Sequence, residues 1–239
     1  MKHFDTPTGI QKKRELTNRL ILGIFAFILF MIGDWLLDMK SAGNVTTGIV
    51  ESDWVSMSMW RFEASILLAA VAMPFYWVGI HAAKEIVTEG LRNGTKWDKR
   101  MFRMFCVGAN AGLISFLFIH IMCCLFPIVF KCIYAETGDS LMATNLVNQS
   151  SAYIMLPFAA YYVVADGCIS ASWIYMAWTG KLKLKKWQVL FCPLCTLLIG
   201  FVFNLIPVLK LINGAFESLG TLLIMCALCY SVRKAEPTR

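Results

Sequence analysis

The stretch Ser151–Gly180 reads SAYIMLPFAAYYVVADGCISASWIYMAWTG, and Asp166 is its single charged residue. The stretch is long enough to cross a bilayer, since a transmembrane helix needs about 20 predominantly apolar residues. A carboxylate inside a membrane costs about 2.5–3.5 kcal/mol on insertion scales, so it usually faces a bundle interior or a water-filled cavity. We therefore expect the rest of the chain to form helices that surround Asp166.

The composition predicts a multi-pass membrane protein. Of the 239 residues, 58% are hydrophobic and 15% are charged, whereas a soluble domain is about 25% charged. The net charge of +7 comes from basic residues at the ends of apolar runs, which is the topology signal of membrane proteins. No RNA- or DNA-binding motif accompanies them, so nucleic acid is set aside and membrane lipid is the expected partner.

Apolar runs predict an all-α bundle of six transmembrane helices in one domain, 1–239. The expected spans are 18–38, 60–86, 102–130, 152–178, 188–208 and 214–232. Eighteen of the 22 lysines and arginines fall on the side that holds both termini. By the positive-inside rule, both termini are expected in the cytoplasm.

Two features of the sequence argue against a secreted protein. The first 17 residues are polar and a full-length apolar run follows, so no cleavable signal peptide is expected. The nine cysteines are scattered, mostly inside apolar runs, which is unlike a disulfide framework. Cys192-Pro-Leu-Cys195 and Cys226-Ala-Leu-Cys229 have the spacing of a zinc or redox site, but positions i and i+3 of a helix also form one packing face.

Polar side chains recur at one depth of the expected bundle. Counted from the basic residue at the cytoplasmic end of each span, five of them lie 15–18 residues away, or about 22–27 Å at 1.5 Å per residue. These five are Asp34, His120, Asp166, Asn204 and Glu217, and Glu63 lies somewhat closer to the outer surface. Tyr162 and Ser170 share a helix face with Asp166 at i±4 spacing. The sequence thus predicts a polar layer in the outer half of the membrane.

Such a layer has several chemical uses. Asp, Glu and His together can bind a divalent cation such as zinc or manganese, act as general acid and base, relay protons, or hold a cationic substrate. The alternative is that these groups pair with one another and with Arg61, fixing helix packing, or face outside water. As candidate catalytic residues we take Asp166, His120 and Glu63. As candidate substrate-binding residues we take Asp34, Arg61, Glu217, Asn204 and Tyr162.

The leading hypothesis is a site that opens to the outer face, binds a cation or lipid headgroup, and acts on a lipid-like substrate. The alternatives are a small proton- or cation-coupled transporter or channel, and a non-catalytic membrane interaction protein. Whether the protein is an enzyme stays open. Nucleophilic catalysis has weak support, because Ser170 and Ser172 follow Asp166 but no G-x-S-x-G pattern occurs. His81, beside Lys84, is expected to be an interfacial histidine.

The first half of the chain contains a series of short motifs: Gly33-Asp34-Trp35-Leu36, Met59-Trp60-Arg61-x-x-x-Ser65, Pro74, Gly79, Gly112, His120 and Pro127. This series resembles a family of small bacterial integral membrane proteins of unknown function. The resemblance implies a multi-helix domain in the bacterial inner (plasma) membrane. It implies no activity.

Overall fold

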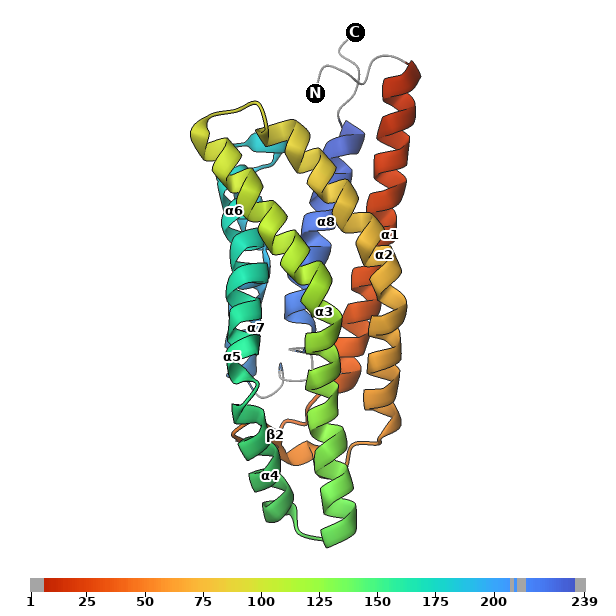
Figure 1. Ribbon diagram of the computed structural model, residues 1–239, viewed down its shortest axis with the longest axis vertical. Helices are drawn as coiled ribbons and strands as arrows, with labels where there is room; N and C mark the ends of the chain where they lie inside the picture. The colour runs from red at the N-terminus through yellow and green to blue at the C-terminus, as the bar shows by residue number, and fades with distance from the viewer. Residues whose placement is uncertain (1–6, 207–208, 210–213, 235–239) are drawn as a thin grey trace.

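The computed structural model of the chain describes residues 7–206, 209 and 214–234. Within these ranges the protein is a bundle of helices with one short β-hairpin (Figure 1). The α-helices are α1 (Pro7–Asp38), α2 (Trp60–Leu91), α3 (Lys96–Thr137), α4 (Ser140–Ala152), α5 (Met155–Tyr161), α6 (Gly167–Trp178), α7 (Pro193–Asn204) and α8 (Phe216–Lys234).

The remaining elements are short. The antiparallel strands β1 (Thr46–Thr47) and β2 (Val50–Glu51) precede the 3-10 helix η1 (Ser52–Val55). A π-helix, η2 (Tyr162–Asp166), joins α5 to α6, and two further 3-10 helices are η3 (Lys181–Lys183) and η4 (Lys186–Phe191). Single π-turns inside α-helices occur frequently at functional sites, and here one ends at Asp166.

Small residues let the helices approach closely. α1 packs along α2 and α8, α3 packs on α2 and α6, and α7 packs on α8. Where α1 crosses α2, a Cβ added at Gly23 would lie 2.9 Å from the Cα of Gly79, so both positions require glycine. A Cβ at Gly108 of α3 would lie 2.7 Å from the carbonyl oxygen of Ala165, which sets η2 directly against α3.

The membrane expectation is confirmed in its coarse form. Four helices (α1, α2, α3 and α8) are long and apolar enough to cross a membrane. A fifth span is possible if α4, α5, η2 and α6 are counted together, with a 55° bend between Ser140–Ala152 and Met155–Trp178. Outward-facing apolar side chains such as Leu67, Ile114 and Phe118 are 64%, 82% and 53% exposed, as expected for contact with lipid tails.

The expected fifth span, 188–208, does not form one long helix. Its first part is the 3-10 helix η4, and Pro193 then starts α7, which has 12 residues. At 1.5 Å per residue α7 is about 18 Å long, well below the roughly 30 Å of a bilayer core. Residues 207 and 208 of this expected span lie outside the described residues.

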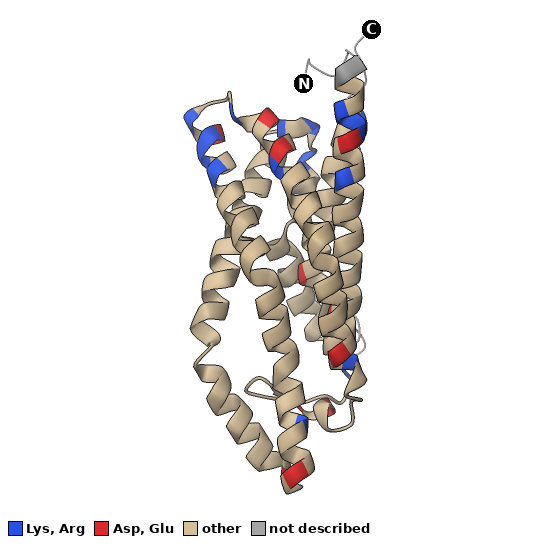
Figure 2. Cartoon of the chain, turned by 45° about the vertical axis from the view of Figure 1, so that its right-hand side comes forward, with Lys and Arg blue, Asp and Glu red and all other residues tan. Residues whose placement is uncertain are grey.

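The two ends of the bundle differ in charge (Figure 2). Lysines and arginines gather at the end where α1 begins, α8 ends and η3 lies; we call this the basic end. The opposite end, which we call the hairpin end, is covered by the β-hairpin, η1 and α4. Trp54, Phe62, Phe130 and Val147 form a small apolar cluster there.

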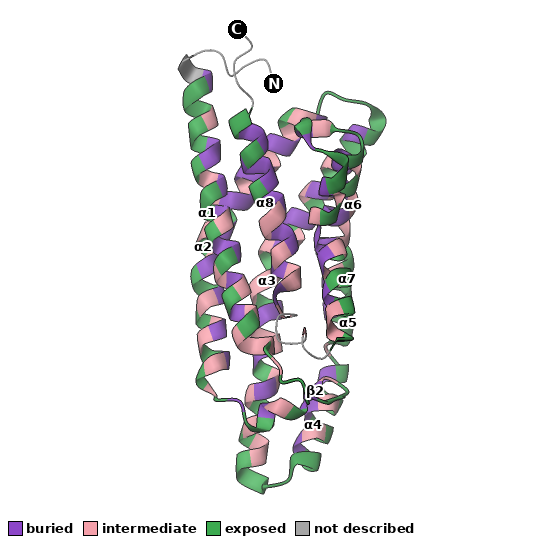
Figure 3. Cartoon of the chain, turned by 180° about the vertical axis from the view of Figure 1, so that it is seen from behind, coloured by how far each residue is buried: buried purple, intermediate pink, exposed green. Residues whose placement is uncertain are grey.

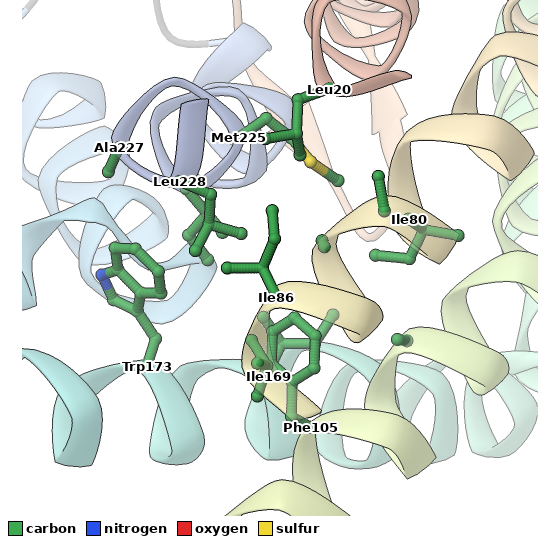
Figure 4. Close-up of a cluster of buried hydrophobic side chains, with 14 of the residues drawn as sticks. Leu20, Ile80, Ile86, Phe105, Ile169, Trp173, Met225, Ala227 and Leu228 are labelled. Carbon is green, nitrogen blue, oxygen red and sulfur yellow. The ribbon is translucent and has the colours of Figure 1, made fainter. Parts of the chain in front are cut away.

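The main core lies between the polar layer and the basic end. Figure 3 shows buried residues where the helices face one another and exposed residues on the outer faces. Figure 4 shows the centre of this core, where Phe105, Trp173, Met225 and Leu228 converge from α3, α6 and α8. Each precedes or follows the polar layer on its own helix, on the side of the basic end. The polar residues therefore lie between this apolar core and the hairpin end.

Candidate functional site

His120 and Asp34 form the centre of the site, and Ser65 lies behind them. The Nδ1 of His120 lies 3.3 Å from the Oδ1 of Asp34, and its Nε2 lies 2.9 Å from the Oγ of Ser65. The Ser65 hydroxyl also donates to the carbonyl oxygen of Gly33 over 2.8 Å. Because a hydroxyl has one proton, donation to Gly33 leaves Ser65 as an acceptor for an Nε2–H of His120. An imidazolium paired with the Asp34 carboxylate satisfies all of these contacts.

This arrangement has the order of a Ser-His-Asp triad, but the serine is not placed to attack a substrate. Ser65 is 0% exposed and does not line the cavity described below. Its hydroxyl is enclosed by Gly33, His120 and the thiol of Cys124, whose Sγ is 3.5 Å away. Ser65 therefore orients the imidazole, as the partner of a histidine's second nitrogen commonly does.

Glu217 and Ser218 bring the start of α8 to the same place. The Ser218 hydroxyl donates to the Oδ2 of Asp34 over 2.5 Å, so both oxygens of this carboxylate are engaged. Glu217 accepts a hydrogen bond from the Tyr162 hydroxyl. It also lies near enough to Asp34 and Asp166 for electrostatic interaction with each.

Asp166 lies deeper than the other carboxylates. It is 4% exposed, and its Oδ2 is buried with no hydrogen-bond partner among the residues that the structure describes. Ala165, beside it, packs against Gly108, so the π-helix is fixed in place by α3. Asp166 does not line the cavity, and Tyr76 and Tyr161 are close enough to it to interact electrostatically.

A cavity of about 310 Å³ joins these groups at the hairpin end. Carboxylates and aromatic rings dominate its lining. The carboxylates are Asp34, Asp38, Glu51 and Glu217, and the rings are those of Trp54, Phe116, Phe126, Phe158, Tyr161 and Tyr162, with His120 as the imidazole. Among the described residues, the four carboxylates outnumber the two cationic groups that pair with them, Lys40 and His120, so this lining favours a cationic occupant.

Lys40 and two carboxylates form an ion-pair network at the rim of the cavity. The Lys40 Nζ lies 2.8 Å from the Oδ1 of Asp38 and 2.9 Å from the Oε1 of Glu51. Burial raises the pKa of Glu51, but hydrogen bonds from Asn44 and Lys40 outweigh burial and hold that pKa below its usual value. Burial lowers the pKa of Lys40, but Asp38 and Glu51 outweigh it and raise that pKa.

Four of the sequence candidates lie outside the cavity, and Asp166, described above, is one of them. Glu63 is exposed on α2. Arg61 donates to the carbonyl oxygens of Leu36 and Met39 over 3.0 and 3.3 Å, so it caps the end of α1 rather than pairing with the carboxylates. Asn204 is the last residue of α7 and is absent from the cavity lining. Asp34, His120, Glu217 and Tyr162 are the candidates that the fold brings together around one space.

The geometry offers no ready ligand set for a divalent cation. Within residues 7–206, 209 and 214–234, no three His, Cys, Asp or Glu side chains are arranged to hold a metal ion. This includes the two Cys-x-x-Cys pairs, whose cysteines are all free thiols. His81 stacks on Trp77 with ring centres 4.8 Å apart, away from the cavity.

Comparison with family models gives one match, described as a family of unknown function (DUF6796), over residues 10–235. The chain belongs to the DUF6796 family. The match covers nearly the whole chain, and the expectation of a family of unknown function is confirmed. The searches of curated proteins and of solved structures found no match.

The candidate set omitted Ser65, as it omitted Asp38, Glu51 and Ser218. Ser65 belongs to the quoted motif Met59-Trp60-Arg61-x-x-x-Ser65, Gly33 and Asp34 belong to the first quoted motif, and His120 is quoted in the same series. In the DUF6796 chain these motif residues converge on a single hydrogen-bond network. The signal that could have identified Ser65 was therefore its membership of the same motif set.

Proposed function

We propose that this DUF6796 protein is a multi-pass protein of the inner membrane that binds a cationic, amine-bearing headgroup of a lipid-like molecule in the cavity at the hairpin end. The single observation that supports this is the lining of the cavity, which combines four carboxylates with aromatic walls. Aromatic rings bind ammonium groups through cation–π attraction, and carboxylates neutralise their charge. The same rings accommodate the apolar part of the ligand.

The distribution of charge supports an orientation for the protein. The basic end faces the cytoplasm by the positive-inside rule, and the cavity then opens to the outer face. A ligand headgroup enters from the outer leaflet and stops above the apolar core. The volume of about 310 Å³ is at the small end of ligand pockets, which suits one headgroup.

Within this site His120 and Asp34 are the groups we assign to proton transfer. His120 is held from behind by Ser65 and faces the cavity beside Asp34. The imidazolium is the proton donor of this pair and the Asp34 carboxylate is its base, and a reaction on a bound headgroup requires both roles.

The test is ligand-dependent stabilisation of the purified full chain in detergent. A ligand that binds the folded state raises its unfolding temperature with concentration. We expect lysophosphatidylethanolamine to stabilise the wild type more than it stabilises Asp34→Asn or Glu217→Gln, and lysophosphatidylglycerol to stabilise all three alike. This dependence on the two carboxylates is the preference for a cation that the test measures. Glu63→Gln is the matched control, because it removes a carboxylate from the exposed face of α2 and should keep the preference.

Two outcomes would overturn the assignment. If lysophosphatidylethanolamine stabilises Asp34→Asn and Glu217→Gln as much as the wild type, the carboxylates do not select a cation. If Glu63→Gln loses the preference as fully as Asp34→Asn, the effect is one of overall charge and not of the cavity.

A second candidate, proton-coupled transport of a cation, is favoured by Asp166. Its unpartnered Oδ2 continues the carboxylate series from Asp34 through Glu217 toward the bundle interior, as in a proton relay. It predicts uptake of the amine probe into proteoliposomes when a pH gradient is imposed, and loss of uptake in Asp166→Asn. Binding without gradient-dependent uptake rejects transport. A loss of detergent stability alone in Asp166→Asn would instead assign the residue to helix packing.

A further inference from the structure

A second hollow lies at the basic end, between α8 and the segment formed by η3 and η4. Its volume is about 520 Å³. Three lysines and three aromatic side chains stand out in its lining, namely Lys183, Lys185, Lys234, Trp187, Phe191 and Tyr230. None of these residues belongs to the cavity at the hairpin end, so this hollow is a separate site.

The loop that carries two of the lysines is held in an unusual conformation. Leu182 and Lys183 have φ angles of 55° and 58°, a region that non-glycine residues adopt infrequently. The Leu182 side chain is 7% exposed and packs against Gly90 of α2, where a Cβ would overlap it. The Ser231 hydroxyl of α8 donates to the carbonyl oxygen of Leu182. These contacts hold the turn in its unusual conformation and place Lys183 beside α8.

A second set of hydrogen bonds positions Lys185. The backbone N–H of Lys185 donates to the Gln188 side chain over 2.7 Å, and Gln188 is 8% exposed. The indole N–H of Trp173, at the centre of the core, donates to the carbonyl oxygen of Gln188 over 2.7 Å. The wall that carries Lys185 and Trp187 is therefore anchored to α6, and the hollow is a preformed feature of the fold.

The three lysines present an unbalanced positive charge. Among the described residues, no carboxylate forms an ion pair with Lys183, Lys185 or Lys234. The Nζ of Lys234 lies 5.6 Å from the centre of the Tyr230 ring, which leaves its charge available to an anion. By contrast, Lys181 at the start of the same loop pairs with Asp98 at 3.1 Å.

The surroundings of the lysines favour a lipid over a free anion. Trp187, which lines the hollow, is 55% exposed, and Trp178 at the end of α6 is 64% exposed; exposed tryptophans mark the level of lipid headgroups. Phe191 and Ala227 extend the lining on its apolar side. Basic pockets between transmembrane helices at the cytoplasmic surface are known to bind acidic lipid headgroups.

We propose that this hollow binds the headgroup of an anionic phospholipid from the leaflet at the basic end. The phosphate lies against Lys183, Lys185 and Lys234, and an acyl chain runs along Phe191 and Ala227. The proposal is independent of the ligand at the hairpin end, because the two cavities share no lining residue.

Retention of lipid by the purified full chain tests the proposal, measured by native mass spectrometry from mixed micelles. The probes are phosphatidylglycerol and phosphatidylcholine of identical acyl composition. We expect the wild type to retain phosphatidylglycerol in preference, and a Lys183→Gln, Lys185→Gln, Lys234→Gln variant to lose the preference. Each lysine removed is expected to weaken the apparent affinity about fivefold. The matched control is Arg92→Gln, Lys96→Gln, Lys99→Gln, which removes the same charge from exposed positions at the same end.

Three results would overturn the proposal. Equal retention of the two lipids by the wild type shows no headgroup selection, and this comparison does not depend on any variant. An equal loss in both triple variants shows a general attraction to the basic end. In a third arm, stabilisation of the wild type by inorganic phosphate as large as that by phosphatidylglycerol assigns the site to a free anion. Phosphatidylglycerol retention restricted to the wild type and the control supports the assignment.

Discussion

His120 of α3 joins two other helices through its two ring nitrogens. Its Nδ1 faces the Asp34 carboxylate of α1 at 3.3 Å, and its Nε2 contacts the Ser65 hydroxyl of α2 at 2.9 Å. The ring is 6% exposed, and each partner is itself bonded again, Asp34 to Ser218 and Ser65 to Gly33. The imidazole is therefore both part of the cavity wall and a polar link between the three longest helices.

Replacing His120 should reduce the stability of the bundle. His120→Ala leaves Asp34 and Ser65 with one fewer partner each in a buried setting, and each such loss costs about 1–3 kcal/mol. We expect a lower unfolding temperature in detergent. His81→Ala is the control, because His81 lies outside the cavity and stacks on Trp77. An unfolding temperature for His120→Ala that equals that of His81→Ala would contradict a linking role.

The variant Ser65→Ala tests whether Ser65 orients the imidazole of His120 or acts as a nucleophile. The variant loses the hydrogen bonds to Gly33 and His120, so a loss of about 1–3 kcal/mol in stability is expected. Binding of a cationic headgroup should weaken modestly and not vanish, because Asp34 and Glu217 remain. Calorimetric titration of the variant checks this. Complete loss of turnover with unchanged binding, in an assay that uses a lipid substrate, would instead make Ser65 a catalytic residue.

The close crossing of α1 and α2 depends on two glycines. Gly79→Ala introduces a Cβ that overlaps the backbone of Gly23, so the helices must separate. Overpacking of this kind typically costs about 1–3 kcal/mol. Gly43→Ala is the control, since a Cβ there has no neighbour within 4 Å among the described residues. Thermal unfolding in detergent should show a clear loss for Gly79→Ala and little change for Gly43→Ala.

The sequence predicted much of the fold because apolar length is a strong signal in membrane proteins. The spans expected at 18–38, 60–86 and 102–130 lie inside α1, α2 and α3, and the span expected at 214–232 overlaps α8 from Phe216 onward. The signal is weaker where a helix is broken. Segment 152–178 contains a π-helix that ends at Asp166, and 188–208 begins with a 3-10 helix. Such local departures from 3.6 residues per turn are invisible to a hydropathy window.

The depth of each polar side chain along its helix was predictable from the sequence, but the side of the helix on which it lies was less so. Counting residues from the basic residue at the end of each span placed Asp34, His120 and Glu217 at one depth, and these three residues line the same cavity. The same count included Glu63, which is exposed, whereas Ser65 is fully buried two residues later. Each residue turns a helix by about 100°, so height alone does not decide which side chain faces the interior.

The rim network predicts a pH-dependent contribution to stability. The pKa of Glu51 is held below its usual value by Asn44 and Lys40, so its stabilising effect is complete above the pKa of an unfolded glutamate and is lost as pH falls through the folded value. The raised pKa of Lys40 has the opposite pH dependence: the contribution of Lys40 to stability is present at neutral pH and is lost only when the pH becomes strongly alkaline. Glu51→Gln should therefore lower the unfolding temperature at pH 7, and the difference from wild type should shrink on acidification. A difference that does not change with pH would contradict this.

Carbodiimide labelling distinguishes the carboxylates that line the cavity from the deeper one. Glu217 lines the cavity and Asp166 does not, although both lie in the same polar layer. A water-soluble carbodiimide should therefore modify Glu217 and leave Asp166 unmodified, as read by mass spectrometry of peptides. An apolar carbodiimide, which enters the membrane, should reach Asp166 as well. A cationic headgroup bound in the cavity should protect Glu217 from the soluble reagent, whereas exposed Glu63 should react with or without that ligand. Modification of Asp166 by the soluble reagent alone would show that water reaches past Glu217, and the cavity would then extend into the bundle as the transport mechanism requires.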